Sequence, residues 1–568
     1  MDYMAQPSDD KPILIAGGGP FGLTLSIELS RRGVRSLIVD PKETTAVNPQ
    51  ANATQARTME HYRRLGFADE IRSLGLPADY PTDIAYFTRY AQRELARFRL
   101  PSSADAPQLV RGMGGSWSAA ELPHRVSQKF VEQVLRRHAE ASPLATIRNG
   151  TRLVEFSQDD AGVDAIVEEV ENGETLKIRT PYLVGADGAR GVVRRALGIR
   201  YSGESGVQRD FFGGKMVALY LRAPDFYKAM PHARAWMYWA FNNERRSWLA
   251  AVNGVDEFAF HTQLKPGEDE AITPERARAM FHQVMGMPLE IELLNIDTWL
   301  AGHALVAERF ISGRVIIGGD AAHLFTPAGG LGYNTAVDDA VNLGWKLAGV
   351  LKGTGGPALL ESYQFERSKL AVRNTGYARA LAESIGTFLP SPDIEDDSAA
   401  GEAARSEAAD YLNAHARREF NIPGVTFGGR YDGSPVIVPD DTEPPEDAAN
   451  TYVPSATPGG RAPHLWLDDG RSLFDLFGFE WTLLILGEQQ DDAGFVRAAP
   501  RMGIDLRVVH LPLDAVRTLY DSDLVLIRPD QIVAWRKRLP FDPNEVLARV
   551  VGASGDLSVR SQSMVGGV

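Results

Sequence analysis

Three turns that combine glycine with aspartate are the residues of this chain best suited to chemistry. They are Gly17-x-Gly19-x-x-Gly22 with Asp40 beyond it, Asp187-Gly188, and Gly319-Asp320 with the loop that follows. Each turn comes after a short apolar run typical of a buried strand and leads toward a helix. Glycine lets the backbone approach a ligand closely, and a helix start offers unpaired N–H groups. The turns therefore suit a polar cofactor with anionic character.

The first turn has the context of a dinucleotide-binding motif. An apolar strand precedes it, a helix begins near Pro20, and a second apolar strand ends at Asp40. Gly17 and Gly19 permit a tight turn beside a pyrophosphate, and Gly22 permits close helix–strand packing. Asp40 lies near the expected spacing of about 20 residues and can accept hydrogen bonds from a ribose diol. The pattern predicts dinucleotide binding.

The third turn belongs to the stretch around which the chain is organised, residues 313–353. A short apolar strand ends at the glycines before Asp320, and a loop follows that holds Pro327 and several glycines up to Gly332. Beyond Asn334, apolar residues recur at helical spacing. A helix start at this point presents the positive end of its dipole to a ligand.

Length and composition set the class of protein. The chain has 568 residues, 44% hydrophobic and 24% charged, which predicts two or three globular domains. A net charge of −14 argues against nucleic acid or an anionic membrane as a partner. The chain has no cysteine, which excludes disulfides, thiolate metal sites and thiol redox catalysis. No secretory signal or membrane-spanning run is present, so we expect a cytoplasmic protein.

Other segments leave their roles open. Arg57 starts an amphipathic helix, where local sequence favours a solvated arginine, and Gln128 lies in the first turn of another helix. Residues 210–300 read as strands rich in aromatic side chains, among them Trp236 and Tyr238. This segment could form the wall of an aromatic-binding pocket or only the packed face of a sheet. Residues 391–410 are acidic and polar and are predicted to be a loop or linker, and the tail alternates strands and helices as a small α/β domain.

Taken together, the three ordered motifs resemble those of the single-component FAD-dependent aromatic hydroxylases, the class A flavoprotein monooxygenases. The resemblance covers most of residues 12–387 and is closest to the phenol hydroxylase and 3-(3-hydroxyphenyl)propionate hydroxylase branch. It implies an α/β fold with a Rossmann-like FAD-binding domain of the para-hydroxybenzoate hydroxylase (GR2) type. It also implies an inserted β-rich substrate domain and a C-terminal thioredoxin-like domain.

The resemblance divides the chain into FAD-binding residues 1–200, with part of the substrate sheet at about 80–125, and a β-rich substrate domain at 201–300. These are followed by FAD-binding residues 301–390, by a linker at 391–460 and by a thioredoxin-like domain without cysteines at 461–568.

The resemblance also implies a role for individual residues. The FAD-binding set is Gly17, Gly19, Gly22, Asp40, Arg57, Gln128, Asp187, Gly319, Asp320, Gly332, Tyr333 and Asn334. Within it, Arg57 and Gln128 would touch the diphosphate region, Asp320 the ribitol, and the backbone of residues 332–334 the flavin pyrimidine edge. Pro327 beside the flavin ring and Asn52 are the candidate catalytic residues, and Trp236 and Tyr238 are candidate substrate contacts.

The sequence departs from the family pattern at three points. Gly191 stands where a serine usually follows the DG motif. Asn52 stands where phenol hydroxylases have an aspartate thought to deprotonate the substrate, and an asparagine cannot act as a base. The C-terminal domain lacks the cysteines of thioredoxin chemistry.

By resemblance, NAD(P)H (NADH or NADPH) reduces noncovalent FAD, and O2 adds to give a flavin hydroperoxide that hydroxylates a small phenolic or aromatic substrate. Two alternatives stay open: a tailoring or resistance hydroxylase acting on a polyketide or antibiotic, and a non-catalytic flavin-fold binding protein. No second GxGxxG follows a strand, which disfavours two-dinucleotide flavoenzymes. We expect no metal, and we allow for a homodimer.

Overall fold

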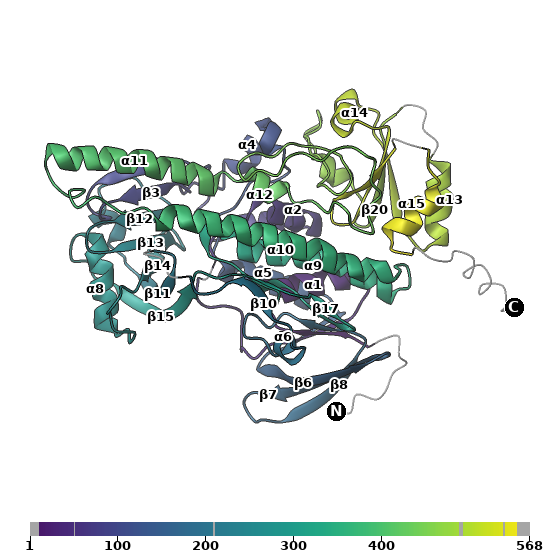
Figure 1. Ribbon diagram of the computed structural model, residues 1–568, viewed down its shortest axis with the longest axis horizontal. Helices are drawn as coiled ribbons and strands as arrows, with labels where there is room; N and C mark the ends of the chain where they lie inside the picture. The colour runs from purple at the N-terminus through teal and green to yellow at the C-terminus, as the bar shows by residue number, and fades with distance from the viewer. Residues whose placement is uncertain (1–10, 50, 208–210, 488–491, 538–539, 554–568) are drawn as a thin grey trace.

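The computed structural model describes residues 11–49, 51–207, 211–487, 492–537 and 540–553 (Figure 1). Within these residues the strands form sheets of six, seven and four strands and two smaller sheets of three strands. The six-stranded sheet and the seven-stranded sheet each have their own buried apolar core. No helix in the described part of the chain has the length and apolar character needed to cross a bilayer.

The six-stranded sheet has the strand order β17-β18-β9-β1-β2-β5, in which only β17 runs antiparallel to its neighbour. Its strands are β1 Ile13–Ala16, β2 Ser36–Val39, β5 Ala145–Arg148, β9 Leu183–Gly185, β17 Ile311–Ser312 and β18 Val315–Ile317. The helices α1 Pro20–Arg31, α5 Gln128–Glu140 and α9 Leu331–Leu351 pack with this sheet and with one another. These residues thus form the predicted Rossmann-like domain, because fully buried apolar strands alternate with helices.

The seven-stranded sheet has the order β15-β11-β14-β13-β12-β3-β4. Its strands are β3 Ile84–Phe87, β4 Glu94–Phe98, β11 Gly214–Arg222, β12 Met237–Phe241, β13 Arg246–Ala251, β14 Glu257–Gln263 and β15 Glu292–Ala301. Two segments more than a hundred residues apart therefore share one sheet, since β3 pairs in parallel with β12. Helix α8, Pro274–Met285, interrupts the strand-rich segment and buries Met280, Phe281 and Val284 in the core of this sheet.

One prediction about the connection between domains was wrong. Residues 391–410 do not form a loop or linker throughout, because helix α11 spans Ala399–Phe420. Ser398 caps this helix by accepting a hydrogen bond from Gly401 N at 3.1 Å. The polar composition belongs to its exposed side, while Ala408, Leu412 and Ala416 are buried in the core of the seven-stranded sheet. Helix α11 packs on β4 and covers that end of the sheet (Figure 1).

The C-terminal residues form a four-stranded sheet of order β21-β20-β22-β23. Its elements are β20 Trp481–Ile485, β21 Leu506–His510, β22 Leu524–Ile527, β23 Val533–Arg536, α13 Ala493–Arg501, α14 Asp514–Tyr520 and α15 Pro543–Val550. The long helix α10, Pro357–Gly386, runs from the side of α11 to the side of this domain (Figure 1).

Candidate active site

The three predicted turns leave the same edge of the six-stranded sheet. Strands β1 and β18 both pair in parallel with β9, and the register places Ala16 and Ile317 beside Gly185. The turns that follow these strands, at Gly17, Asp187 and Gly319, are therefore neighbours in space. The carboxyl ends of parallel strands are where α/β sheets bind ligands. The structure thus brings together motifs that lie 300 residues apart in the chain.

The first turn is built around glycines with different tasks. Gly17 has a φ of +118°, and a Cβ there would lie 2.1 Å from Ala186 O, so no other residue fits. A Cβ on Gly22 would lie 2.1 Å from Gly17 O, which explains the close approach of α1. A Cβ on Gly19 would meet no protein atom within 4 Å. Gly19 therefore borders open space, where the anionic part of a cofactor can approach the start of α1.

Asp40 closes this turn from the end of β2. Its Oδ2 accepts a hydrogen bond from Gly18 N at 2.6 Å, and its Oδ1 accepts one from Lys42 N at 2.8 Å. A carboxylate held in this way keeps further lone pairs available for hydroxyl donors.

Asp187 lies in the second turn with half of its carboxylate unused. Its Oδ2 accepts a hydrogen bond from Val193 N at 2.9 Å at the start of helix α6, Val192–Ala196. Its Oδ1 is buried and has no partner in the part of the chain that the structure describes. Burial raises the pKa of this carboxyl, although the backbone hydrogen bond opposes the shift. A Cβ on Gly191 would lie 2.0 Å from Oδ1. A side chain at Gly191, where this sequence departs from the family pattern, would therefore displace the Asp187 carboxylate from this position.

The third turn exposes Asp320 and buries its neighbours. Gly319 has a φ of +58° and donates its N–H to Asp339 Oδ2 at 3.2 Å, while Asp339 also accepts from buried His323 and Arg367. The Asp320 side chain reaches solvent, yet surrounding protein desolvates it and raises its pKa, with His323 opposing the shift. An acceptor held in such a recess suits the hydroxyl groups of a bound ligand.

The loop before α9 presents backbone groups to the same region. Pro327 is exposed, and Gly329 and Gly330 follow with φ values of +72° and +62°. Asn334 fixes the loop, since its Oδ1 accepts from Gln55 N at 2.8 Å and its Nδ2 donates to Gly330 O at 2.6 Å. Its role is thus to join the start of α9 to the segment around residue 55.

Gln55 belongs to the same hydrogen-bond network, whereas the Tyr333 side chain bonds elsewhere. Gln55 Nε2 donates to Gly329 O at 2.8 Å, a contact that the motifs had not suggested. The Tyr333 hydroxyl lies 2.5 Å from that of Tyr62, so this side chain turns away from the loop and only its backbone is left for a cofactor.

Asn52 and Gln128 lie in one buried neighbourhood. Gln128 N donates to Ala51 O at 2.7 Å, and Gln128 Nε2 donates to Glu132 Oε1 at 2.6 Å.

 The backbone bond from Gln128 to Ala51 ties the start of α5 to the segment that holds Asn52. Asn52 is 8% exposed, and no described residue forms a hydrogen bond with its Oδ1. An unpaired buried amide oxygen costs free energy unless a ligand supplies a donor.

Arg57 has different partners from those that the resemblance implied. Its guanidinium donates to Glu60 Oε2 at 3.0 Å, to Gln531 Oε1 at 2.7 Å and to Asp530 O at 2.6 Å. The last two belong to the C-terminal domain. The structure therefore places Arg57 at a domain contact, and its contact with the FAD diphosphate stays a prediction.

The two candidate substrate residues, Trp236 and Tyr238, have different surroundings. Tyr238 is fully buried; its hydroxyl accepts from Ala235 N at 2.7 Å and its ring packs against Phe226 and Phe87. The hydroxyl and the ring of Tyr238 are both engaged within the sheet, which favours the packed face over the predicted substrate contact. Trp236 is 2% exposed and lies under the guanidinium of Arg125 at 4.6 Å.

The opposite face of the sheet carries aromatic side chains with unused polar atoms. Trp239 is in register with Tyr86 on β3 and with Trp248 on β13. Tyr86 Oη, Trp239 Nε1 and Trp248 Nε1 are all buried and find no hydrogen-bond partner among the described residues. Three such groups on one face are unusual, since buried polar atoms are normally paired. Trp239 and Trp248 appeared in the sequence only as part of an aromatic segment, and Tyr86 gave no signal.

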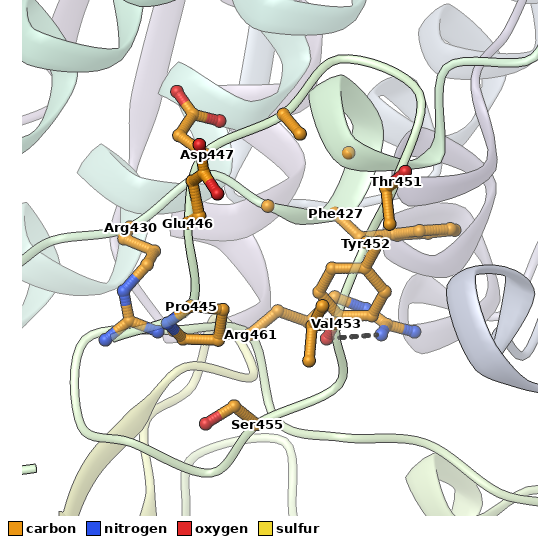
Figure 2. A pocket seen from close by; sticks show the side chains of 14 residues that line it. Phe427, Arg430, Pro445, Glu446, Asp447, Thr451, Tyr452, Val453, Ser455 and Arg461 are labelled. Carbon is orange, nitrogen blue, oxygen red and sulfur yellow. Dashed lines mark hydrogen bonds between the residues drawn. The ribbon is translucent and has the colours of Figure 1, made fainter. Parts of the chain in front are cut away.

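Two surface cavities lie elsewhere. Figure 2 shows the first, between Phe427, Arg430, Asp447 and Tyr452, with a volume of about 20 Å³. That space holds about one water molecule. A cleft of about 660 Å³ is lined by Tyr182, which precedes β9, and by residues near the start of β18 and of α10. It therefore lies at the opposite ends of the strands from the three turns.

The geometry at the three turns fits FAD. Open space at Gly19 suits a pyrophosphate, Asp40 a ribose, and Asp320 the ribitol hydroxyls, while the unpaired Asp187 Oδ1 leaves an acceptor for a ligand. These turns on a Rossmann-like sheet, together with a second, mixed seven-stranded sheet, define a flavoprotein of the aromatic hydroxylase type.

Comparison with known proteins agrees. Residues 10–377 match the family model "FAD binding domain", and residues 455–554 match "Aromatic-ring hydroxylase, C-terminal". The chain belongs to this family of FAD-dependent aromatic-ring hydroxylases and is an FAD-dependent aromatic monooxygenase.

Relatives with similar sequences include aklavinone 12-hydroxylase DnrF from Streptomyces peucetius, 33% identical over 88% of this chain and 96% of that protein. Phenol 2-monooxygenase from Pseudomonas sp. (strain EST1001) is 30% identical over 95% of this chain and 92% of that protein. Among solved structures, chromopyrrolic acid-soaked RebC with bound 7-carboxy-K252c has a TM-score of 0.85 and 31% identity, covering 96% and 99% of the two chains.

Proposed function

We propose that this enzyme hydroxylates a phenolic aromatic compound of more than one ring, with NAD(P)H as reductant and O2 as oxidant. The observation that carries the choice is the aromatic face of Tyr86, Trp239 and Trp248. These residues lie on three adjacent strands, which span roughly 10 Å at about 4.8 Å per strand. A face of that width is larger than one benzene ring. Hydroxylases of polyketides among the relatives support the same choice.

FAD bound at the three turns supplies electron transfer from NAD(P)H and activation of O2. The residues of this chain supply binding and position. Gly17, Gly19 and Gly22 would hold the pyrophosphate, Asp40 the ribose and Asp320 the ribitol. The unpaired acceptor of Asp187 completes this set.

The loop from Pro327 to Asn334 faces the reacting end of the cofactor in this proposal. The N–H groups of Gly332, Tyr333 and Asn334 at the start of α9 would stabilise negative charge on the flavin. The Asn52 amide would accept a hydrogen bond from the substrate hydroxyl, because its Oδ1 has no partner. Gln128 positions the segment that carries Asn52.

The function is tested with a panel of phenols that pairs single-ring members with fused-ring members. We expect faster product formation, and more product per NAD(P)H consumed, for the fused-ring members. Equal or better turnover of single-ring phenols would refute the choice of substrate class. The preference for NADH or NADPH follows from the same assay, while a homodimer and a cytoplasmic location stay predictions.

A further inference from the structure

One buried arginine stands apart from the others in the described part of the chain. Arg125 is 6% exposed, yet it has neither an ion pair nor a side-chain hydrogen bond among the described residues. Every other buried arginine there is paired with a carboxylate. These pairs are Arg32–Glu28, Arg72–Glu121, Arg245–Glu268, Arg367–Asp339, Arg461–Glu60, Arg528–Glu366 and Arg536–Asp440. An anionic ligand that pairs with this guanidinium would offset the cost of desolvating its charge.

The backbone directs Arg125 toward the site. Thr54 and His124 exchange two backbone hydrogen bonds of 2.8 Å as an antiparallel bridge, which places Ala53 opposite Arg125. Opposite residues of an antiparallel pair point to the same face. The Cβ of Ala53 would lie 3.3 Å from a Cβ on Gly330, the residue that begins α9. Arg125 therefore shares a face with the loop that follows Pro327.

The surroundings of Arg125 are aromatic and acidic. Its guanidinium lies 4.6 Å from the centroid of the Trp236 ring, and Trp236 packs edge-on against Phe420 at the end of α11. Glu419 beside Phe420 opposes the effect of burial, which lowers the pKa of Arg125 to about 10. Both Glu419 oxygens are occupied, since Oε1 accepts from Gly329 N at 2.9 Å and Oε2 lies 2.7 Å from His415 Nε2. Among the described residues Glu419 forms no ion pair and no hydrogen bond with Arg125, so the guanidinium donors stay available to a ligand.

We propose that Arg125 binds an anionic oxygen of the aromatic substrate, a phenolate or a carboxylate, while Trp236 holds the plane of the guanidinium. This inference rests on the proposed function, because it assigns a substrate feature to the same site. A guanidinium forms charge-assisted hydrogen bonds with an anionic oxygen in a fixed geometry. Arg125 is accordingly a specificity-determining residue that selects acidic aromatic compounds.

The test measures binding to the FAD-loaded enzyme without NAD(P)H, by the change in flavin fluorescence. Two probe pairs are titrated: 2-naphthoate against 2-naphthamide, and 4-nitrophenolate against 4-nitroanisole. We expect the anion of at least one pair to bind wild type about tenfold or more tightly than its neutral partner. Arg125→Met should remove this preference and Arg125→Lys should keep part of it. The probe pair that shows the preference identifies the bound anion as a carboxylate or as a phenolate.

The matched control is Arg234→Met, since Arg234 is exposed and lies 4.3 Å from the ring centroid of Tyr227 on the same domain. This variant should keep the wild-type preference. Arg125→Met should also keep its FAD content and its melting temperature, because it removes an unpaired charge and not an ion pair.

Three results would overturn the proposal: no preference for either anion in wild type, an unchanged preference in Arg125→Met, or loss of FAD from Arg125→Met with the preference retained. The last result would make Arg125 a cofactor-binding residue. The titrations need no turnover, so an enzyme that selects anions but hydroxylates nothing would refute the proposed function and leave this inference standing.

Discussion

Replacing Arg461 with methionine should destabilise the contact between the C-terminal domain and the FAD-binding domain. The Arg461 guanidinium is 2% exposed and makes two hydrogen bonds to Glu60, one of them from Nε to Oε2 at 2.9 Å. Burial alone would raise the pKa of Glu60, but Arg461 and Arg57 lower it from 4.5 to about 2. A shift of that size corresponds to about 3 kcal/mol. Arg461→Met leaves Glu60 buried with one partner fewer, so the free energy of unfolding should fall by a similar amount.

The assay is equilibrium unfolding in urea at pH 7, followed by tryptophan fluorescence, with both proteins loaded with FAD. Arg461→Met should lose about 3 kcal/mol of unfolding free energy. Arg471→Met is the control, because Arg471 forms an ion pair with Asp469 in which the two side chains are 60% and 48% exposed. Such an exposed pair contributes little to stability, because water and salt screen its charges. Equal losses in the two variants would refute the assigned role of the buried pair.

The pH dependence follows from the same pair. Because the folded state lowers the pKa of Glu60 from 4.5 to about 2, its stabilisation is complete above pH 4.5 and is lost as the pH falls toward 2. The stability difference between wild type and Glu60→Gln should therefore shrink over this range. A difference that stays constant from pH 5 to pH 2.5 would contradict the shift.

Further predictions concern the cofactor and the substrate. Gly22→Ala should lower the melting temperature, since its Cβ would lie 2.1 Å from Gly17 O, whereas Gly19→Ala should fold normally and bind FAD more weakly; equal melting temperatures would contradict this contrast. Asp320→Ala should weaken FAD binding by roughly 1.5–3 kcal/mol, measured by titration of the apoprotein, and an unchanged affinity would remove it from the site. Asn52→Ala should lower the ratio of product to NAD(P)H consumed, with the remainder appearing as hydrogen peroxide; an unchanged ratio and substrate affinity would exclude Asn52.

The turns that we propose to bind FAD could be predicted from local sequence patterns. A strand, a glycine turn and an acid follow one another within a few residues at Gly17 and at Gly319, so the sequence shows them without knowledge of the fold. The register of β1, β9 and β18 then brings them together, as the parallel sheet requires. The Rossmann-like fold was predictable for the same reason.

Roles that depend on distant partners could not be predicted. Arg57 begins a helix like many solvated arginines, and only the docking of the C-terminal domain brings Asp530 and Gln531 to it. Tyr238 and Trp239 are adjacent in sequence, but alternation along β12 places them on opposite faces. Arg125 is conspicuous only because it is buried without an ion pair to any carboxylate that the structure describes, and burial depends on the whole fold.

The central claim is that the protein transfers an oxygen atom from O2 to an aromatic ring with bound FAD. The direct test supplies the purified yellow protein with NAD(P)H, the panel of phenols and ¹⁸O2, and measures the product by mass spectrometry. We predict a hydroxylated product that carries one ¹⁸O atom, formed only when FAD is bound. Oxygen derived from water in the product, or NAD(P)H consumption that yields only hydrogen peroxide across the whole panel, would contradict the claim.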